Sequence, residues 1–127
     1  KHTPYPGNAN SNGYDLVYKS QTHPTIIAEI KSTEPSGANF YGQQITELRD
    51  DLTNLTQEKR DSRLQKGEFA KAIKVMVLLD NVKTAYKELV KNMNYVEIIE
   101  TNLFKQQYDR NALKKKKIYV VFVKPKR

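Results

Sequence analysis

Apolar and polar residues alternate along two short stretches near the start of the chain, at residues 13–20 and 25–32. Alternation with a period of two predicts strands that each bury one face. Between the two stretches, residues 21–24 read Gln-Thr-His-Pro, which favours a turn. We therefore expect the two stretches to pair as a β-hairpin.

The second of these strands carries charged residues inside an apolar run, TIIAEIKS. Because a strand alternates its faces, Glu29 and Lys31 point the same way. The opposite face, formed by Ile26, Ala28 and Ile30, is expected to enter a core. Two interpretations fit the charged face: it is a wet face on which both side chains are solvated, or it is a site built on a rigid strand.

Beyond the hairpin, apolar residues recur at helical spacing. One apolar stripe is formed by Ile45, Leu48, Leu52 and Leu55. This spacing predicts a long amphipathic helix over residues 42–65, with a charged outer face and with Gly67 at its end.

The second half of the chain alternates expected strands and helices. Residues 72–80 are almost continuously apolar, which suits a central strand covered on both faces. An apolar stripe over residues 82–93 predicts a helix that Asn81 can cap and that turns Tyr86 into the core. Further elements are expected at 95–100 (strand), 103–113 (helix) and 118–123 (strand). We expect one α/β domain over residues 1–127, with a mixed central sheet flanked by helices.

Charge and composition limit the classes of binding partner that the chain is expected to have. The 22 Lys and Arg residues outnumber the 14 Asp and Glu residues, giving a net charge of +8 that favours a polyanionic partner such as nucleic acid. Simple solubility is the alternative explanation for this charge. The absence of Cys excludes disulfides and thiolate zinc sites and fits a cytoplasmic location. No apolar run approaches the roughly 18 residues of a membrane span, so no membrane partner is expected.

Three charged residues of the hairpin are candidates for chemistry. Asp15 lies on the first strand, on the face opposite Leu16, and can converge with Glu29 and Lys31 on one side of the hairpin. Two carboxylates a few ångströms apart repel each other unless a cation lies between them. Oxygen ligands without Cys or His favour a hard ion, Mg²⁺ first. A lysine beside that ion could orient water or neutralise charge on a phosphate, which predicts metal-assisted phosphodiester hydrolysis.

These residues resemble the motif of the PD-(D/E)XK nuclease superfamily, and the chain is similar to its type II restriction-endonuclease branch. The motif would be Asp15, a 13-residue spacer, and Glu29-Ile30-Lys31. The resemblance implies that Asp15, Glu29 and the backbone carbonyl of Ile30 bind the metal and that Lys31 is the catalytic lysine. It also implies a restriction-endonuclease-like core, to which residues 13–80 correspond.

The resemblance has two departures. Tyr14 stands where the family often has a proline, and only 14 residues precede Asp15 although the family core usually begins with a helix and a strand before that position. We therefore expect the chain to be a fragment of a longer protein or to have a trimmed core. On this interpretation, the chain by itself is expected to lack activity, and an exposed sheet edge or bare apolar face beside the hairpin would mark where the first elements belong.

Candidate contacts to nucleic acid surround the start of the long helix. They are Ser32, Asn39, Tyr41, Gln43 and Gln44. Backbone N–H groups at a helix start can hold a phosphate, whereas an ordinary glycine-containing loop explains the same residues equally well. The run Lys114–Lys117 could follow a phosphate backbone or could simply be solvated.

The function expected from the sequence is that of a Mg²⁺-dependent DNA endonuclease of the restriction type, acting on double-stranded DNA. A DNA-repair or recombination nuclease on the same core is one alternative, and a catalytically silent nucleic-acid-binding module is another. In its full-length form the protein is expected to be a homodimer, because cutting two antiparallel strands suits a two-fold partner.

Overall fold

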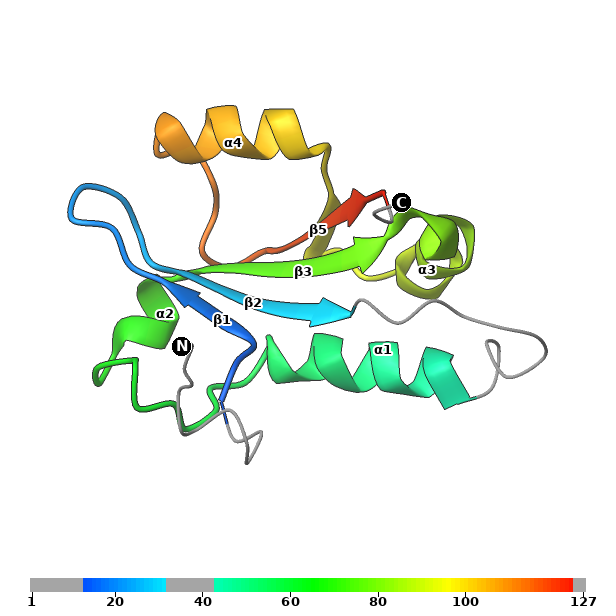
Figure 1. Ribbon diagram of the computed structural model, residues 1–127, viewed down its shortest axis with the longest axis horizontal. Coiled ribbons are helices and arrows are strands. Elements are labelled where there is room, and N and C mark those ends of the chain that lie inside the picture. The colour runs from blue at the N-terminus through cyan, green and yellow to red at the C-terminus, as the bar shows by residue number, and fades with distance from the viewer. Residues whose placement is uncertain (1–12, 32–42, 125–127) are drawn as a thin grey trace.

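The computed structural model describes residues 13–31 and 43–124, and describes no side chains for residues 43–48. The elements are β1 (Leu16–Tyr18), β2 (Ile26–Lys31), α1 (Gln43–Asn54), α2 (Glu68–Lys71), β3 (Ile73–Leu79), the 3₁₀ helix η3 (Asp80–Val82), α3 (Lys83–Val90), β4 (Val96–Ile98), α4 (Thr101–Asp109) and β5 (Ile118–Val123). They form a five-stranded sheet with the order β1-β2-β3-β5-β4 (Figure 1). Strand β1 is antiparallel to β2 and all other neighbours are parallel, which confirms an α/β fold with a mixed sheet.

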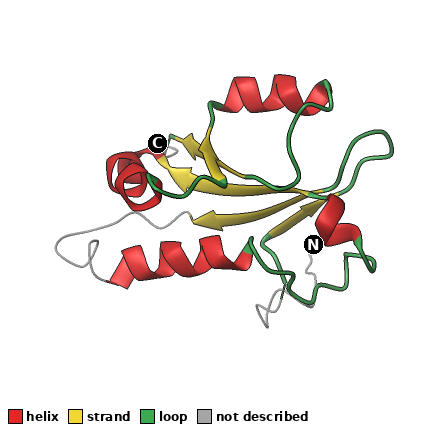
Figure 2. Cartoon of the chain, turned by 180° about the vertical axis from the view of Figure 1, so that it is seen from behind, coloured by secondary structure: helices red, strands yellow, loops and turns green. Residues whose placement is uncertain are grey.

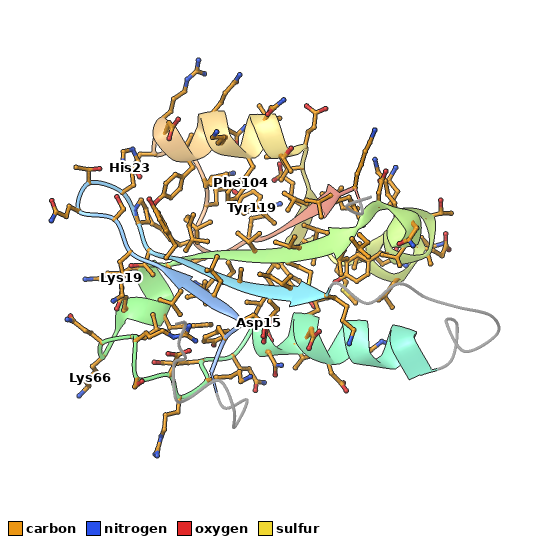
Figure 3. All side chains as sticks on the ribbon, in the orientation of Figure 1. Asp15, Lys19, His23, Lys66, Phe104 and Tyr119 are labelled. Atoms are coloured by element: carbon orange, nitrogen blue, oxygen red, sulfur yellow. The ribbon has the colours of Figure 1, made fainter. Side chains whose placement is uncertain are left out.

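Helices cover both faces of the sheet (Figures 1 and 2). Helices α1, α2 and α3 pack on one face, where the buried core residues include Ile27, Leu52, Leu55, Met76, Tyr86 and Val120. Helix α4 packs on the other face, where the core residues include Ala28, Val75, Tyr119 and Val121. Figure 3 shows Phe104 of α4 and Tyr119 of β5 between that helix and the sheet, and their rings meet edge to face with centroids 6.0 Å apart.

Strand β3 lies at the centre of the sheet, between β2 and β5. Its residues alternate between the two cores: Val75 enters the core beneath α4, and Met76 enters the core beneath α1 and α3. The almost continuous apolar sequence follows from this position, because a strand covered on both faces buries every side chain. The expectation of a central, doubly covered strand is confirmed, and Tyr86 is fully buried as expected.

The β1–β2 hairpin is also confirmed, with Leu16 opposite Ala28 and Tyr18 opposite Ile26. Its turn is ordered by Ser20, whose Oγ accepts hydrogen bonds from the backbone N–H groups of Thr22 (3.2 Å) and His23 (3.1 Å). At the tip of the hairpin, the Nε2 atom of His23 lies 2.9 Å from the carbonyl oxygen of Asp109, at the end of α4.

The first long helix ends earlier than its apolar stripe predicts. Helix α1 stops at Asn54 instead of continuing to residue 65. Its last turn tightens, since Leu55 N–H donates to the carbonyl of Leu52 (3.0 Å) and Thr56 N–H to that of Thr53 (2.9 Å). Bonds of this i to i−3 type commonly close a helix, and Asn and Thr are weak helix formers. The charged residues that follow fold back onto the start of β1 instead of forming an outer helix face.

The start of α3 also differs from the expectation. Asn81 does not cap this helix: the 3₁₀ turn Asp80–Val82 precedes it, and Val82 occupies the capping position without a side-chain hydrogen bond. The early turn buries Val82 under the sheet and leaves Asn81 exposed. Within the described part of the chain, no helix combines the length and apolar character needed to cross a bilayer.

Candidate active site

The candidate site lies where β1 and β2 diverge. If the observed register is extended by one residue, Asp15 stands directly opposite Glu29. Opposite residues of an antiparallel pair share a face, so their carboxyl groups meet. The side chain of Asp15 also takes the place of a backbone acceptor in the hairpin, because its Oδ2 accepts a hydrogen bond from the Ile30 N–H at 2.8 Å. Figure 3 shows Asp15 at the beginning of β1, beside the face of the sheet that α1 covers.

The two carboxyl groups differ in exposure. Asp15 is exposed, whereas Glu29 is only 4% exposed. The interpretation of a wet strand face is therefore wrong for Glu29, because its face of β2 is the one that α1 covers and that also carries the buried Ile27. Asp15 is therefore accessible to solvent, whereas Glu29 lies beneath the surface next to it.

This arrangement strongly perturbs Glu29. The pKa of Glu29 is raised from 4.5 to about 7. Burial is the largest cause; the Asp15 charge, a hydrogen bond between the two carboxyl groups and the Asp51 charge add to it, and the charge of Lys59 opposes it. A carboxyl group with this pKa holds its proton through much of the acidic range. A cation entering between the two groups would remove the repulsion and displace that proton.

The other two motif residues lie next to the pair. Lys31 follows Glu29 on the same face of β2 and is partly buried, opposite Leu78 of β3. The N–H of Ile30 points toward Asp15, and in an extended strand the carbonyl of the same residue points to the same edge. The side chain of Ile30 is 42% exposed, so its expected place in the core is wrong: the cover from α4 does not extend to this end of β2.

A segment of the chain far from the hairpin fixes Tyr14, the residue before Asp15. Tyr14 N–H donates to Asp61 Oδ2 at 2.8 Å, and Arg63 Nη2 donates to the Tyr14 carbonyl oxygen. The Tyr14 hydroxyl donates to the carbonyl of Gln57 (3.1 Å) and accepts from the N–H of Lys59 (2.9 Å). Residues 57–63 thus hold both the backbone and the side chain of Tyr14, and we call them the clamp.

An ion pair stiffens the clamp. The Arg63 guanidinium lies 2.6 Å from Asp61 Oδ2, and the Asp61 side chain is almost fully buried. Burial alone would raise the pKa of Asp61, but hydrogen bonds from Arg63 and from the Tyr14 N–H outweigh it and lower the pKa to about 2. Gly13 leaves room for this pair, since a Cβ atom there would lie 2.2 Å from Asp61 Oδ2.

Two residues near the carboxylates were missed by reasoning from the sequence. Lys59 places its Nζ 3.8 Å from Glu29 Oε2 and 3.1 Å from the Gly13 carbonyl oxygen. Asp51 of α1 is close enough to Glu29 to raise its pKa. Lys59 falls on the charged outer face predicted for a helix over residues 42–65. Only the early end of α1 brings Lys59 to the site, and no local sequence signal marks it.

The structure describes only part of the candidate nucleic-acid contacts. Ser32, Asn39 and Tyr41 lie outside the described residues, and Gln43 and Gln44 are the first two residues of α1, where side chains are not described. The run Lys114–Lys117 precedes β5, which is parallel to β3, while Glu29 lies toward the carboxyl end of β2. The lysine run is therefore at the opposite end of the sheet from the carboxylate pair.

The donor set at the carboxylate pair fits a hard divalent ion. Within residues 13–31 and 43–124, no group of three or more His, Asp and Glu side chains is arranged to hold a metal. Mg²⁺, however, is commonly bound through one or two carboxylates and completes its coordination with water and substrate phosphates. Asp15, Glu29 and the carbonyl of Ile30 suit that mode.

The chain matches no protein-family model, no curated protein and no solved structure.

Proposed function

We propose that the chain is the catalytic part of a Mg²⁺-dependent DNA endonuclease, most simply of the restriction type, with a site similar to that of the PD-(D/E)XK nucleases. The observation that carries this proposal is the pairing of the Asp15 carboxyl group with the buried carboxyl group of Glu29, whose pKa is raised to about 7 by burial first and by the Asp15 charge second. Two facing carboxyl groups, one of them buried, are a costly arrangement in a strand, and a divalent cation relieves that cost.

Each residue of the site has a role in this proposal. Asp15, Glu29 and the Ile30 carbonyl hold the ion, which when bound polarises the scissile phosphate and lowers the pKa of a water molecule. The hydrogen bond from Ile30 N–H fixes one oxygen of Asp15, so the carboxylate is oriented in advance. Lys31, on the same face as Glu29, neutralises charge that develops on the phosphate or orients the attacking water.

The DNA partner is supported by charge. The net charge of +8 attracts a polyanion, and the exposed Asp15 gives a phosphate access to the pair. We place the duplex across the diverging end of β1 and β2, beside the end of α1, and along this helix toward its start, where free backbone N–H groups and a partial positive charge favour phosphate (Figure 1).

The decisive experiment measures cation binding and cleavage separately. Calcium titration by calorimetry at pH 7.5 is expected to show one site in the wild type, and binding at least tenfold weaker in Asp15→Asn and in Glu29→Gln. Plasmid DNA incubated with the protein is expected to be cut with Mg²⁺ and to stay intact with EDTA. Lys31→Ala is expected to abolish cutting while keeping calcium binding. Lys105→Ala, at an exposed position of α4, is the matched control.

The outcomes separate the alternatives. Cation binding with cleavage of branched or damaged DNA only would assign the site to a repair or recombination nuclease. DNA binding without any cation site would identify a silent binding module. Absence of a cation site together with wild-type DNA cleavage in Lys31→Ala would overturn the proposal.

A further inference from the structure

A cavity of about 540 Å³ lies at the amino ends of β3 and β5, beside the end of α1 and beside α2. Its walls are largely apolar and include Phe69 and Tyr95, and its cationic lining residues are Lys74 and Lys115–Lys117. The volume lies within the range of small-molecule sites, which are concave, mostly apolar and provided with a few polar groups. The carboxylate pair, toward the carboxyl end of β2, contributes nothing to this lining.

Lys74 is the unusual member of the lining. It lies in the middle of the sheet, between Ile27 of β2 and Ile118 of β5, and is only 6% exposed. Its Nζ donates to the carbonyl oxygen of Lys115 (3.1 Å) and lies 4.5 Å from the centroid of the Phe69 ring. Both of these partners also line the cavity, so the ammonium group is at the cavity wall.

The ammonium group of Lys74 is incompletely paired. Among the described residues it has one hydrogen-bond acceptor and no carboxylate within 4.0 Å, although it carries three N–H donors. Burial lowers the pKa of Lys74. A buried charge without a counter-charge destabilises the fold, and an apolar side chain of the same length would avoid this penalty. An anion entering the cavity would supply the missing partner.

The rest of the lining indicates what kind of anion fits. Lys115 and Lys116 are exposed at the rim, and Lys117 Nζ donates to the Asn94 carbonyl oxygen at 3.2 Å, which ties the run to the loop before β4. Several ammonium groups favour a doubly charged phosphate over a single carboxylate. Tyr95, next to that loop, is 38% exposed and offers a flat aromatic surface.

From these observations we propose that the cavity binds a nucleoside monophosphate, with its phosphate at Lys74 and the rim lysines and its base against Tyr95 and the apolar wall. A free nucleotide and the 5′-terminal nucleotide of a single strand offer the same group. The proposal stands apart from phosphodiester cleavage, because no residue of the carboxylate pair takes part in it.

The test is calorimetric titration of the whole chain with deoxyadenosine monophosphate. One site is expected, with at least tenfold weaker binding of deoxyadenosine and of inorganic phosphate. Lys74→Met is expected to weaken binding at least tenfold and to raise the melting temperature, because the uncompensated charge is removed. A role of Lys74 in structure alone, through its bond to the Lys115 carbonyl, would give a lower melting temperature and unchanged affinity.

Further variants keep the test decisive. Tyr95→Leu, at a partly exposed position, is expected to weaken binding of the mononucleotide without unfolding the chain, and Lys105→Met on α4 should leave binding unchanged. Asp15→Asn should also leave it unchanged, so that failure here and failure of the proposed nuclease activity are distinguishable. Displacement by a 5′-phosphorylated tetranucleotide would assign the site to strand ends, and absence of displacement to free nucleotides. No mononucleotide binding, or wild-type affinity in both Lys74→Met and Tyr95→Leu, would overturn the proposal.

Discussion

At the scale of single residues, the buried carboxyl group of Glu29 makes stability depend on pH near neutrality. Its pKa in the folded protein, about 7, lies above the ordinary value of 4.5, so the protonated form stabilises the fold. This contribution is fully present below pH 4.5 and is lost as the pH rises to 7. The pKa rise of about 2.5 units corresponds to roughly 3–4 kcal/mol at most, since one pKa unit equals about 1.4 kcal/mol.

We therefore expect the free energy of unfolding of the wild type to fall between pH 5 and pH 7, as measured by urea denaturation. In Glu29→Gln, which keeps the shape without the charge, this decline should disappear, and the variant should be more stable than the wild type at pH 7.5. Asp15→Asn should shift the decline to lower pH, because the neighbouring charge is removed. If the free energy of unfolding depends on pH equally in the wild type and in Glu29→Gln, Glu29 is not the group responsible for the decline.

A second residue-scale prediction concerns Tyr86. Its hydroxyl group is buried and has no hydrogen-bond partner among the described residues. An unsatisfied buried polar group costs about 1–3 kcal/mol, so Tyr86→Phe is expected to raise the melting temperature. Tyr119→Phe is the contrasting variant, because the Tyr119 hydroxyl accepts the Lys114 N–H at 2.7 Å and its loss should destabilise the fold. A lower melting temperature in Tyr86→Phe would indicate that the hydroxyl is satisfied.

At the scale of elements, the clamp determines where Asp15 lies. Gly13→Ala is expected to destabilise the protein by about 1–3 kcal/mol, because the added methyl group would overlap the Asp61 carboxylate. Gly67→Ala is the matched control: it has a positive φ of 81° but no atom within 4 Å of an added Cβ, so only backbone strain of about 1 kcal/mol is expected. Thermal denaturation of both variants measures the difference, and equal losses would argue against a tight contact at Gly13.

The free energy of unfolding at acidic pH tests the clamp as well. The pKa of Asp61 is lowered to about 2 in the fold, so its contribution is present above its ordinary value of 3.8 and is lost as the pH falls toward 2. Asp61→Asn is therefore expected to cost about 2 kcal/mol at pH 7 and progressively less below pH 4. A constant difference between the two proteins from pH 7 to pH 2.5 would mean that the charge of Asp61 is unimportant.

Much of this architecture follows from the sequence, because it depends on local patterns. Alternation predicted β1 and β2, and the apolar run at 72–80 predicted the central strand β3. The end of α1, the burial of Glu29 and the position of Lys59 could not be predicted in the same way. They depend on contacts between residues far apart along the chain, such as Tyr14 with Asp61 and Lys59, which lie 47 and 45 positions away and which no local pattern encodes.

At the scale of the whole molecule, charge should control DNA affinity. Several phosphates must be neutralised when a basic protein binds a duplex, so affinity is expected to fall steeply with salt. The titration is run with Ca²⁺, which allows binding without cleavage, on the wild type and on Gln43→Ala/Gln44→Ala. The double variant should bind more weakly if the start of α1 touches DNA. If DNA affinity does not change with salt and the double substitution has no effect, the start of α1 is excluded as a DNA-binding surface.

The sheet edge at β1 bears on the expected fragment. Leu16 and Tyr18 are 43% and 51% exposed, on the same face of the sheet as α4 but largely uncovered, next to the exposed Ile30. Such a row of apolar side chains at a described sheet edge is where an additional covering segment would pack. If the protein has such a covering segment, a chain that includes it is expected to show slower hydrogen exchange of β1 than residues 1–127 alone.

The distance along the chain between the hairpin and the clamp also affects biosynthesis. Asp15 and Glu29 leave the ribosome before residues 57–63, which supply the contacts that orient them, and before β5 (residues 118–123), which the central strand β3 needs as its neighbour. A nascent chain therefore carries both carboxylates long before it can arrange them. If the chain has the nuclease activity proposed above, that activity would have to wait until synthesis had passed residue 123.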